Sequence, residues 1–538
     1  MTLLAASIPV RWTDELDTAL RRATQAVEAG ARLIEWRIDA LAEEPDALAA
    51  IKALVRRCPA PCIVTCRVCG EGGDYGGTES HRAEIFEALV RGDHPPRYID
   101  IELAAYQRDT RLRRTISAAL KDGERARDTH TSLILSVHDF DRRPADLLQR
   151  IEAMTNEPAC SVIKVAWQAR SLRDNLEALD LLAQRAKPMI ALCMGRFGLM
   201  SRVLAPKFGG LLTYATDRPT ETTAPGQPTI DELQNVYRFQ RIGPPTKVYG
   251  VIGWPVEHSL GPSIHNAGFE AVEHAGAYLP MAIPPQYEHF KATVGAMLDH
   301  QHLGFRGASV TSPHKEHLLR FVADRGGRID PLAERIGAAN TLVVNDEGFI
   351  ECFNTDAPAA QEALCAGMGI ERSALAGLRV AVLGAGGVAR AIVADLSHDG
   401  AEVTVFNRTQ DRAEALANEF NGREAASGRR TKVVAAKADA IAGDRFDVFI
   451  NCTPMGMAGG PAPDESPLPD DVPLDENVTV FDTVYTPQRT PLIHQAEAHG
   501  ARTISGLDMF LRQAAMQFEH WTGRDAPTEA FAAALKNQ

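Results

Sequence analysis

Eight short apolar segments recur through the first part of this chain, and amphipathic helical stretches such as 14–29 and 172–186 separate most of them. The segments are residues 3–8, 33–38, 62–67, 98–102, 132–138, 162–166, 189–194 and 211–215. Near-continuous apolar strands that alternate with helices indicate a parallel sheet buried on both faces. Eight such units in roughly 200 residues predict an α/β fold of the (β/α)8 TIM-barrel type.

The rest of the chain predicts two further domains. Residues 216–228 are rich in Thr and Pro, a helix is predicted at 230–242, and residues 243–246 are typical of a linker. A second alternation of strands and helices starts at Lys247. We predict a barrel domain at 1–242, a small α/β domain at 247–353 completed by C-terminal helices at 506–538, and a Rossmann-type domain at 354–505.

Composition excludes several classes of partner. The net charge of −13 argues against nucleic acid and anionic membranes. No apolar run approaches the roughly 20 residues that span a bilayer, and the N-terminus lacks the features of a signal peptide. Nine cysteines without a regular framework indicate free thiols in a reducing, cytoplasmic compartment. Cys62 and Cys66 lie in an apolar run, so we predict buried thiols and no metal site. The sequence does not reveal the oligomeric state.

Polar residues follow several barrel strands where parallel strands converge on one mouth. Lys164 has apolar neighbours, which predicts a lowered pKa and Schiff-base chemistry, although a lysine reaching to solvent from a strand end is equally compatible. His138 ends another apolar run and suits general acid–base catalysis. Arg37, Arg67 and Arg202 could hold an anionic substrate, although each alone could be a solvated surface residue.

Motifs along the first 240 residues resemble those of type I 3-dehydroquinate dehydratases. They are Glu35-Trp36-Arg37-x-Asp39, Arg67-x3-Glu71-Gly72-Gly73, Val137-His138-Asp139-Phe140, Ile163-Lys164-Val165-Ala166, Met194-Gly195, Ser201-Arg202 and Thr223-Ala224-Pro225-Gly226-Gln227. The resemblance implies that Lys164 forms an imine with 3-dehydroquinate and that His138, assisted by Glu71, moves the protons. Thr223 stands where Ser is usual and keeps the hydroxyl. The implied substrate contacts are Ser7, Glu35, Trp36, Arg37, Arg67, Arg202, Thr223 and Gln227.

A glycine-rich turn predicts a dinucleotide site. An apolar strand precedes the G-x-G-x-x-A pattern, whose cofactor-binding candidates are Gly384, Ala385, Gly386, Gly387 and Val388. The next strand is followed by Asn407, Arg408, Thr409 and Arg412, where an NAD enzyme would place an acidic residue. Cations and hydroxyls there suit a 2′-phosphate, so NADP is the predicted cofactor.

Residues 247–538 resemble shikimate dehydrogenases along their full length. The motifs are Gly253-x-Pro255-x2-His258-Ser259, Ser309-Val310-Thr311-x-Pro313-His314-Lys315, Gly337-Ala338-Ala339-Asn340-Thr341, Asn354-Thr355-Asp356, Asn451-Cys452-Thr453-Pro454-Met455-Gly456, Asp482-x2-Tyr485 and Gly506-Leu507-Asp508-Met509 with Gln513. The resemblance implies that Lys315 and Asp356 are a catalytic pair, whereas the residues alone favour a structural ion pair. It also implies that Ser259, Gly261, Thr311, Asn340, Tyr485 and Gln513 hold shikimate and that Thr453, Met455, Thr483 and Gly506 line the cofactor.

Gly261 departs from this pattern, because the family usually has a second serine there. Losing a hydrogen bond to a charged group costs about 1.5–3 kcal/mol, so we expect weaker binding of the substrate carboxylate. The favoured hypothesis is an enzyme with small-molecule substrates that forms 3-dehydroshikimate and reduces it to shikimate with NADPH. Alternatives are a dehydrogenase half that Gly261 impairs or that acts on quinate, a Schiff-base aldolase barrel, and a C-terminal binding module.

Overall fold

The computed structural model describes residues 2–126 and 130–536. The chain forms two compact units. The first comprises Met1–Lys247 with Ala275–Ala282 and Thr293–Gly304, and the second comprises Val248–His274, Ile283–Ala292 and Phe305–Gln538. The limits of the three domains predicted from the sequence remain predictions.

The first unit contains an eight-stranded parallel sheet that curls into a barrel. Its strands are β1 (Leu3–Pro9), β2 (Leu33–Arg37), β3 (Cys62–Thr65), β4 (Tyr98–Glu102), β5 (Ser132–Asp139), β6 (Cys160–Gln168), β7 (Met189–Met194) and β8 (Leu212–Ala215). Their order is β7-β6-β5-β4-β3-β2-β1-β8. The Leu211 amide donates to the Met189 carbonyl at 2.9 Å, which joins the two edges. The predicted barrel is confirmed, with strand ends that differ by one or two residues.

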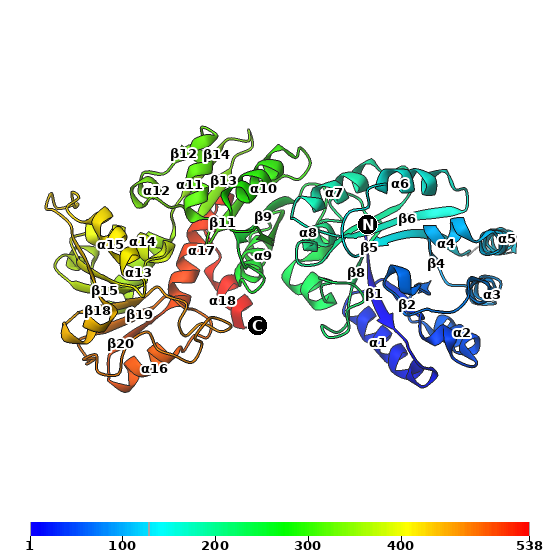
Figure 1. The fold of residues 1–538 in the computed structure, drawn as a ribbon, viewed down its shortest axis with the longest axis horizontal. Helices are drawn as coiled ribbons and strands as arrows, with labels where there is room; N and C mark the ends of the chain where they lie inside the picture. The colour runs from blue at the N-terminus through cyan, green and yellow to red at the C-terminus, as the bar shows by residue number, and fades with distance from the viewer. Residues whose placement is uncertain (1, 127–129, 537–538) are drawn as a thin grey trace. The chain divides into compact units, whose positions relative to one another are not determined.

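Helices surround these strands (Figure 1). They are α1 (Leu16–Glu28), α2 (Ala47–Arg57), α3 (Glu79–Val90), α4 (Leu103–Arg108), α5 (Thr110–Ala126), α6 (Leu147–Asn156), α7 (Asp174–Gln184) and α8 (Leu199–Val203). In α1 the buried residues Ala19, Ala23 and Ala26 recur at helical spacing, so one stripe of the helix faces the barrel. Inside the barrel, Ala5, Leu33 and other apolar residues form a packed layer.

The helix predicted at 230–242 is wrong as a continuous helix. The structure has a π-helical turn, η4 (Glu232–Val236), and a 3-10 turn, η5 (Phe239–Arg241). Arg238 between them has φ 53°, in the left-handed region. An α-helix cannot continue through that conformation, so the apolar spacing is served by two separate turns.

The second unit contains a mixed sheet and a parallel sheet. In the mixed sheet β9 (Lys247–Gly253), β11 (Phe305–Val310), β13 (Thr341–Val344), β14 (Ile350–Phe353) and β12 (Arg328–Ile329) are adjacent in that order. Strand β10 (Gly276–Ala282) and helix α10 (Tyr287–Asp299) lie between β9 and β11 in sequence. Nearby helices are α9 (Gly261–Ala271), α11 (Lys315–Asp324), α12 (Pro331–Ile336), α17 (Gly506–Thr522) and α18 (Thr528–Lys536). Helix α18 packs against α9.

The parallel sheet has the Rossmann arrangement. Its strands are β17 (Lys432–Ala436), β16 (Glu402–Phe406), β15 (Arg379–Leu383), β18 (Val448–Asn451), β19 (Thr479–Asp482) and β20 (Arg502–Ser505), in that spatial order. The helices are α13 (Asp356–Met368), α14 (Gly387–His398), α15 (Gln410–Phe420) and α16 (Pro491–Ala498). Successive strands are added on one side of β15 up to β17 and on the other side from β18 onward, so the strand order reverses between β15 and β18. Sheets of this kind bind nucleotides at this switch point. No helix within residues 2–126 and 130–536 is long and apolar enough to cross a membrane.

Candidate active sites

A cavity of about 480 Å³, including its open mouth, lies at the carboxyl ends of the barrel strands. Residues from six barrel strands or the loops after them line it, because parallel strands all end at this mouth. Nine predicted residues are among them: Glu35, Arg37, Arg67, Glu71, His138, Lys164, Arg202, Thr223 and Gln227. The structure thus brings together side chains that are spread over almost 200 residues of sequence.

Lys164 projects from β6 and is 6% exposed. Its Nζ donates to Oδ2 of Asp100 at 2.8 Å and lies 3.7 Å from Oε1 of Glu35. The ring of Tyr214 lies under the same atom, 4.4 Å from Nζ to its centroid. The neighbours of Lys164 in sequence are apolar. Its contacts with two carboxylates and an aromatic ring come from other strands, so the spacing of residues within one strand could not reveal them.

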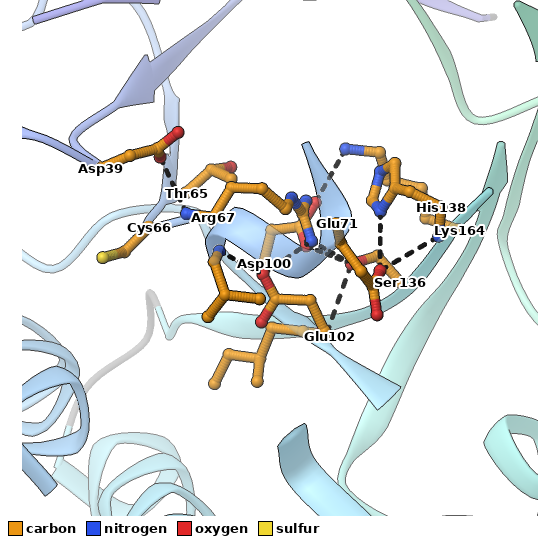
Figure 2. A network of polar contacts seen from close by, with 12 residues as sticks. Asp39, Thr65, Cys66, Arg67, Glu71, Asp100, Glu102, Ser136, His138 and Lys164 are labelled. Carbon is orange, nitrogen blue, oxygen red and sulfur yellow. Dashed lines mark hydrogen bonds and ion pairs between the residues drawn. The ribbon is translucent and has the colours of Figure 1, made fainter. Parts of the chain in front are cut away.

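Asp100 connects Lys164 to a buried arginine (Figure 2). Its Oδ1 accepts hydrogen bonds from Nη2 of Arg67 at 2.8 Å and from Oγ of Ser136 at 2.6 Å. Burial alone would raise the pKa of Asp100, but the charges of Arg67 and Lys164 hold it below its ordinary value. Asp100 is not among the residues that the sequence motifs indicate. Its signal was a carboxylate in the middle of the strand 98–102, since Asp is rarely buried without a partner.

His138 is the penultimate residue of β5, the strand beside β6, and Glu71 lies in the 3-10 turn η3 (Cys69–Glu71). Oε2 of Glu71 lies 3.2 Å from Nδ1 of His138 and accepts from its backbone amide at 3.1 Å. Burial, followed by the charges of Arg67 and Lys164, lowers the pKa of His138 well below its ordinary value. Burial raises the pKa of Glu71 to about 7. The imidazole is therefore neutral near pH 7 and oriented by a carboxyl group, as a general base requires.

Three buried donors in the cavity wall have no hydrogen-bond partner in the described part of the chain: Nε of Arg202, Nε2 of Gln227 and the hydroxyl of Tyr214. No carboxylate of the described residues pairs with Arg202, and burial lowers its pKa to about 10. Buried polar groups are almost always satisfied, so these donors indicate a ligand. Such a ligand would carry a negative charge to pair with the Arg202 cation and oxygen atoms to accept hydrogen bonds from the two neutral donors.

Other predicted residues of this region already have hydrogen-bond or ion-pair partners within the protein. Oγ of Ser7 donates to Oε2 of Glu35 at 2.5 Å and accepts from Oγ1 of Thr223 at 3.0 Å, so hydrogen bonds connect Ser7 to two residues of the cavity wall. A contact of Ser7 with the substrate stays a prediction. Arg37 pairs with Asp39, 2.5 Å from Nη2 to Oδ2. Arg67 pairs with Glu102 at 3.1 Å as well as with Asp100. These arginines line the cavity but are already neutralised, unlike Arg202.

Trp36 does not join the predicted contacts. It is fully buried and is absent from the cavity lining, whereas its neighbours Glu35 and Arg37 line the cavity. Successive side chains of a strand point to opposite faces, so Trp36 faces the helices when its neighbours face the barrel interior. The motif that suggested Trp36 ignored this alternation.

A second constellation lies in the second unit. Nζ of Lys315, at the start of α11, lies 2.6 Å from Oδ2 of Asp356, at the start of α13, and both side chains are buried. Oδ1 of Asn354 accepts from the backbone amide of Asp356 at 3.1 Å, which fixes the beginning of α13. The Ala339 amide donates to the Lys315 carbonyl at 3.0 Å, so the loop before Asn340 is tied to the lysine.

The remaining predicted substrate residues lie on several elements. Oδ1 of Asn340 accepts from the Thr355 amide at 2.8 Å, next to Asp356. Oγ of Ser259 accepts from the Gly261 amide at 3.2 Å, and Gly261 begins α9. The Tyr485 ring stacks on Phe510, with centroids 4.6 Å apart, and Nε2 of Gln513 donates to the Phe510 carbonyl at 3.0 Å. Thr311 follows β11 directly. That Ser259, Thr311, Tyr485 and Gln513 meet at one substrate stays a prediction.

The glycine-rich turn has the form that a pyrophosphate needs. Gly384 has φ +110°, and a Cβ there would lie 3.0 Å from the Cys452 carbonyl oxygen. Gly386 caps α14, which presents its unpaired amides at its N-terminus. A Cβ on Gly387 would lie 3.0 Å from Cδ of Lys315, so this turn approaches the catalytic candidate closely. The residues present therefore fit a dinucleotide.

The other cofactor candidates lie around the same sheet. Nδ2 of Asn407 donates to the Thr409 carbonyl at 2.8 Å, and Arg408 and Arg412 are exposed after β16. Two threonines are tied to Asn451 at the end of β18: Oγ1 of Thr453 donates to its Oδ1 and Oγ1 of Thr483 to its carbonyl, both at 2.7 Å. The Met455 amide donates to Oγ1 of Thr453 at 3.3 Å. A Cβ on Gly506 would lie 2.5 Å from the Thr483 carbonyl oxygen.

Comparison with known proteins gives matches along the chain. Residues 7–244 match the type I 3-dehydroquinase model, 251–342 the shikimate dehydrogenase substrate binding domain, 369–447 the shikimate / quinate 5-dehydrogenase model and 506–536 the shikimate 5′-dehydrogenase C-terminal domain. A chloroplastic bifunctional 3-dehydroquinate dehydratase/shikimate dehydrogenase of Arabidopsis thaliana is 34% identical over 530 residues, which are 96% of this chain and 82% of that protein.

Two further matches cover one half and the whole. A shikimate dehydrogenase (NADP(+)) of Methanocella arvoryzae is 41% identical over 282 residues, 52% of this chain and 95% of that protein. A solved structure of dehydroquinate dehydratase and shikimate dehydrogenase from S. pombe is 22% identical, with a TM-score of 0.42, and covers 99% of this chain and 98% of that one.

Proposed function

Because this chain belongs to the family of bifunctional 3-dehydroquinate dehydratase/shikimate dehydrogenases, we propose that its barrel dehydrates 3-dehydroquinate to 3-dehydroshikimate and that its second half reduces this product to shikimate with NADPH. The observation that carries the first activity is the buried Lys164 amine, which shares one cavity with the neutral His138 and the unpaired Arg202. An amine, a base and an anion-binding cation are the groups that this dehydration needs.

The dehydration proceeds through an imine on Lys164. Nζ attacks the C3 ketone and water leaves, which gives a protonated imine. His138 removes a proton from C2, and the electron pair of that C–H bond moves toward the imine nitrogen. The C1 hydroxyl then takes the proton from His138 and leaves as water, after which hydrolysis releases the enone product. Glu71 orients His138 throughout, consistent with its 3.2 Å contact.

Substrate orientation comes from the free donors of the cavity wall. Arg202 and Gln227 hold the carboxylate of 3-dehydroquinate, because each has a buried donor with no partner among the residues that the structure describes. Glu35 and Thr223 lie in the same wall and complete the contacts to the hydroxyl groups. Oδ2 of Asp100 accepts from the Lys164 ammonium, so this carboxylate holds the amine in place until the ketone arrives.

In the second half, Lys315 and Asp356 handle the proton. When NADPH is bound in the glycine-rich turn, it supplies the hydride that the reduction needs. The Lys315 ammonium donates a proton to the carbonyl oxygen of 3-dehydroshikimate, and Asp356 holds that ammonium at 2.6 Å. Arg408 and Arg412, which are exposed after β16, would hold the 2′-phosphate of NADPH, because two cations stand where an NAD enzyme would place an acidic residue.

A coupled assay tests both activities. Wild-type protein given 3-dehydroquinate and NADPH should consume NADPH. Lys164→Ala should respond only to 3-dehydroshikimate, and Lys315→Ala should form the enone without consuming NADPH. Borohydride added with 3-dehydroquinate should leave a stable adduct on Lys164 of the wild type. Trapping by other ketones alone would favour an aldolase, and no NADPH consumption with 3-dehydroshikimate would favour a binding module.

We also propose a cytosolic location, although the Arabidopsis relative is chloroplastic. All nine cysteines are free thiols, and five of them are buried, which suits a reducing compartment. Cell fractionation tests this location. Recovery of the protein with an oxidising compartment would contradict it.

A further inference from the structure

Tyr214 is the one donor of the cavity wall that neither the motifs nor the proposed dehydration uses. It lies in β8, and its side chain is 5% exposed within the apolar layer that fills the barrel. Its hydroxyl is buried without a hydrogen-bond partner in the described part of the chain. An unsatisfied buried hydroxyl is destabilising, and a phenylalanine ring would fill the same space without that cost.

The position of this ring relates it directly to the reacting amine. Nζ of Lys164 lies over its face, 4.4 Å from the centroid. Tyr214 belongs to the apolar layer and also lines the cavity together with Glu35, Arg37 and Arg67, so its side chain adjoins the polar residues of the site. Burial, reinforced by the Glu35 and Asp100 charges, raises the pKa of Tyr214 well above its ordinary value. The phenol thus stays protonated and acts as a hydrogen-bond donor.

We propose that the Tyr214 hydroxyl donates a hydrogen bond to the oxygen on the substrate carbon that Lys164 attacks. That oxygen is the ketone oxygen at first and the hydroxyl of the tetrahedral carbinolamine afterwards. The hydroxyl of a ring that lies under Nζ is within reach of an oxygen one bond beyond the carbon that Nζ binds. Donation polarises the ketone toward attack and stabilises negative charge that develops on its oxygen.

The step balances without a further reagent. His138 first takes a proton from the Lys164 ammonium, which frees the lone pair of Nζ. The C–N bond then forms as the carbonyl π-bond opens, and the oxygen takes that proton from His138. A second proton passes from the nitrogen to the same oxygen by way of His138, the C–O bond breaks, and the oxygen leaves as water. Tyr214 keeps its own proton throughout, so it is a binding and polarising group rather than an acid that must be recharged.

This inference rests on the proposed dehydration, and the two can fail separately. Absence of a borohydride adduct in the wild type would refute the dehydration whatever Tyr214 does. With the adduct present, Tyr214→Phe is compared with the wild type and with Tyr98→Phe, which removes a hydroxyl from the same apolar layer but outside the cavity lining. The readouts are kcat and KM, the rate of adduct formation at saturating 3-dehydroquinate, and the melting temperature.

We expect Tyr214→Phe to lower kcat/KM by about 3- to 10-fold and to slow adduct formation by a similar factor, the size of one neutral hydrogen bond. Its melting temperature should equal or exceed that of the wild type, because an unpaired hydroxyl is removed. Unchanged kinetics would overturn the proposal. A rise in KM with an unchanged rate of adduct formation would also overturn it, because the hydroxyl would then bind a part of the substrate away from the ketone. A third contrary result is a loss of activity in both Tyr214→Phe and Tyr98→Phe together with lower melting temperatures, because that result indicates a structural role.

Discussion

Replacing Arg202 with methionine should make the barrel more stable and its substrate binding much weaker. The guanidinium is 2% exposed, and no carboxylate of the described residues pairs with it. Burial lowers its pKa from the ordinary value to about 10. The charged form is therefore disfavoured in the folded state by about 3 kcal/mol, at 1.36 kcal/mol for each pKa unit. Because the side chain is still charged at pH 7, the folded protein carries this cost there.

Methionine has a similar length and no charge, so Arg202→Met removes the cost. The upper limit of the gain is about 3 kcal/mol, equivalent to about 6–12 °C in melting temperature for a unit of this size. The bound state changes in the opposite direction. A charge-assisted hydrogen bond to a carboxylate contributes about 1.5–3 kcal/mol, so KM for 3-dehydroquinate should rise about 10- to 150-fold.

Thermal unfolding and steady-state dehydration kinetics measure both effects on the same sample. Arg22→Met is the matched control, because Arg22 pairs with Asp217 at 2.7 Å away from the cavity lining. The control should lose stability and keep its KM. A destabilised Arg202→Met protein with an unchanged KM would show that Arg202 is a structural cation, and the carboxylate site would have to be sought elsewhere.

Three further changes probe other parts of the two sites. Glu71, whose pKa is raised to about 7, is protonated below that pH and ionised above it, so kcat/KM of the dehydratase should rise with pH through about 7. Glu71→Gln should remove this rise in kcat/KM, and an identical pH profile in both proteins would contradict the role of Glu71. Arg408→Ala should raise KM for NADPH about 5- to 30-fold and leave KM for NADH unchanged, and equal effects on both would place Arg408 away from the 2′-phosphate. Gly261→Ser should lower KM for shikimate about 10-fold by restoring a donor at the start of α9; an unchanged KM would show that a backbone amide or water already binds the carboxylate.

The sequence predicted the backbone of the barrel well, because its strands are apolar runs whose period and length differ clearly from those of the helices between them. It also predicted that reactive side chains such as His138 and Lys164 lie on those strands. It could not predict Asp100 as the partner of Lys164, because that contact depends on the pairing of β4, β5 and β6 in the barrel. Strand contacts across a sheet are not visible in residue spacing along one strand.

Two other differences have local causes. The motif at residues 35–39 contains Trp36, but strand alternation turns the Trp36 side chain away from the cavity that Glu35 and Arg37 line. The segment 230–242 has helical spacing, but the left-handed conformation of Arg238 divides it into two turns. In both cases the residue types along the chain indicate one structure, and the backbone conformation of individual residues produces another.

The single carboxylate of Asp100 serves two cations at once, Arg67 through one oxygen and Lys164 through the other. Loss of Asp100 would remove a hydrogen-bonded carboxylate from both buried cations at once, whereas loss of either cation would leave Asp100 paired with the other. Descendants of this barrel should therefore keep Asp100 wherever they keep both Arg67 and Lys164. An engineer who transfers the reactive lysine to another barrel should transfer Asp100 and Arg67 with it, because Asp100 orients the amine and Arg67 pairs with Asp100.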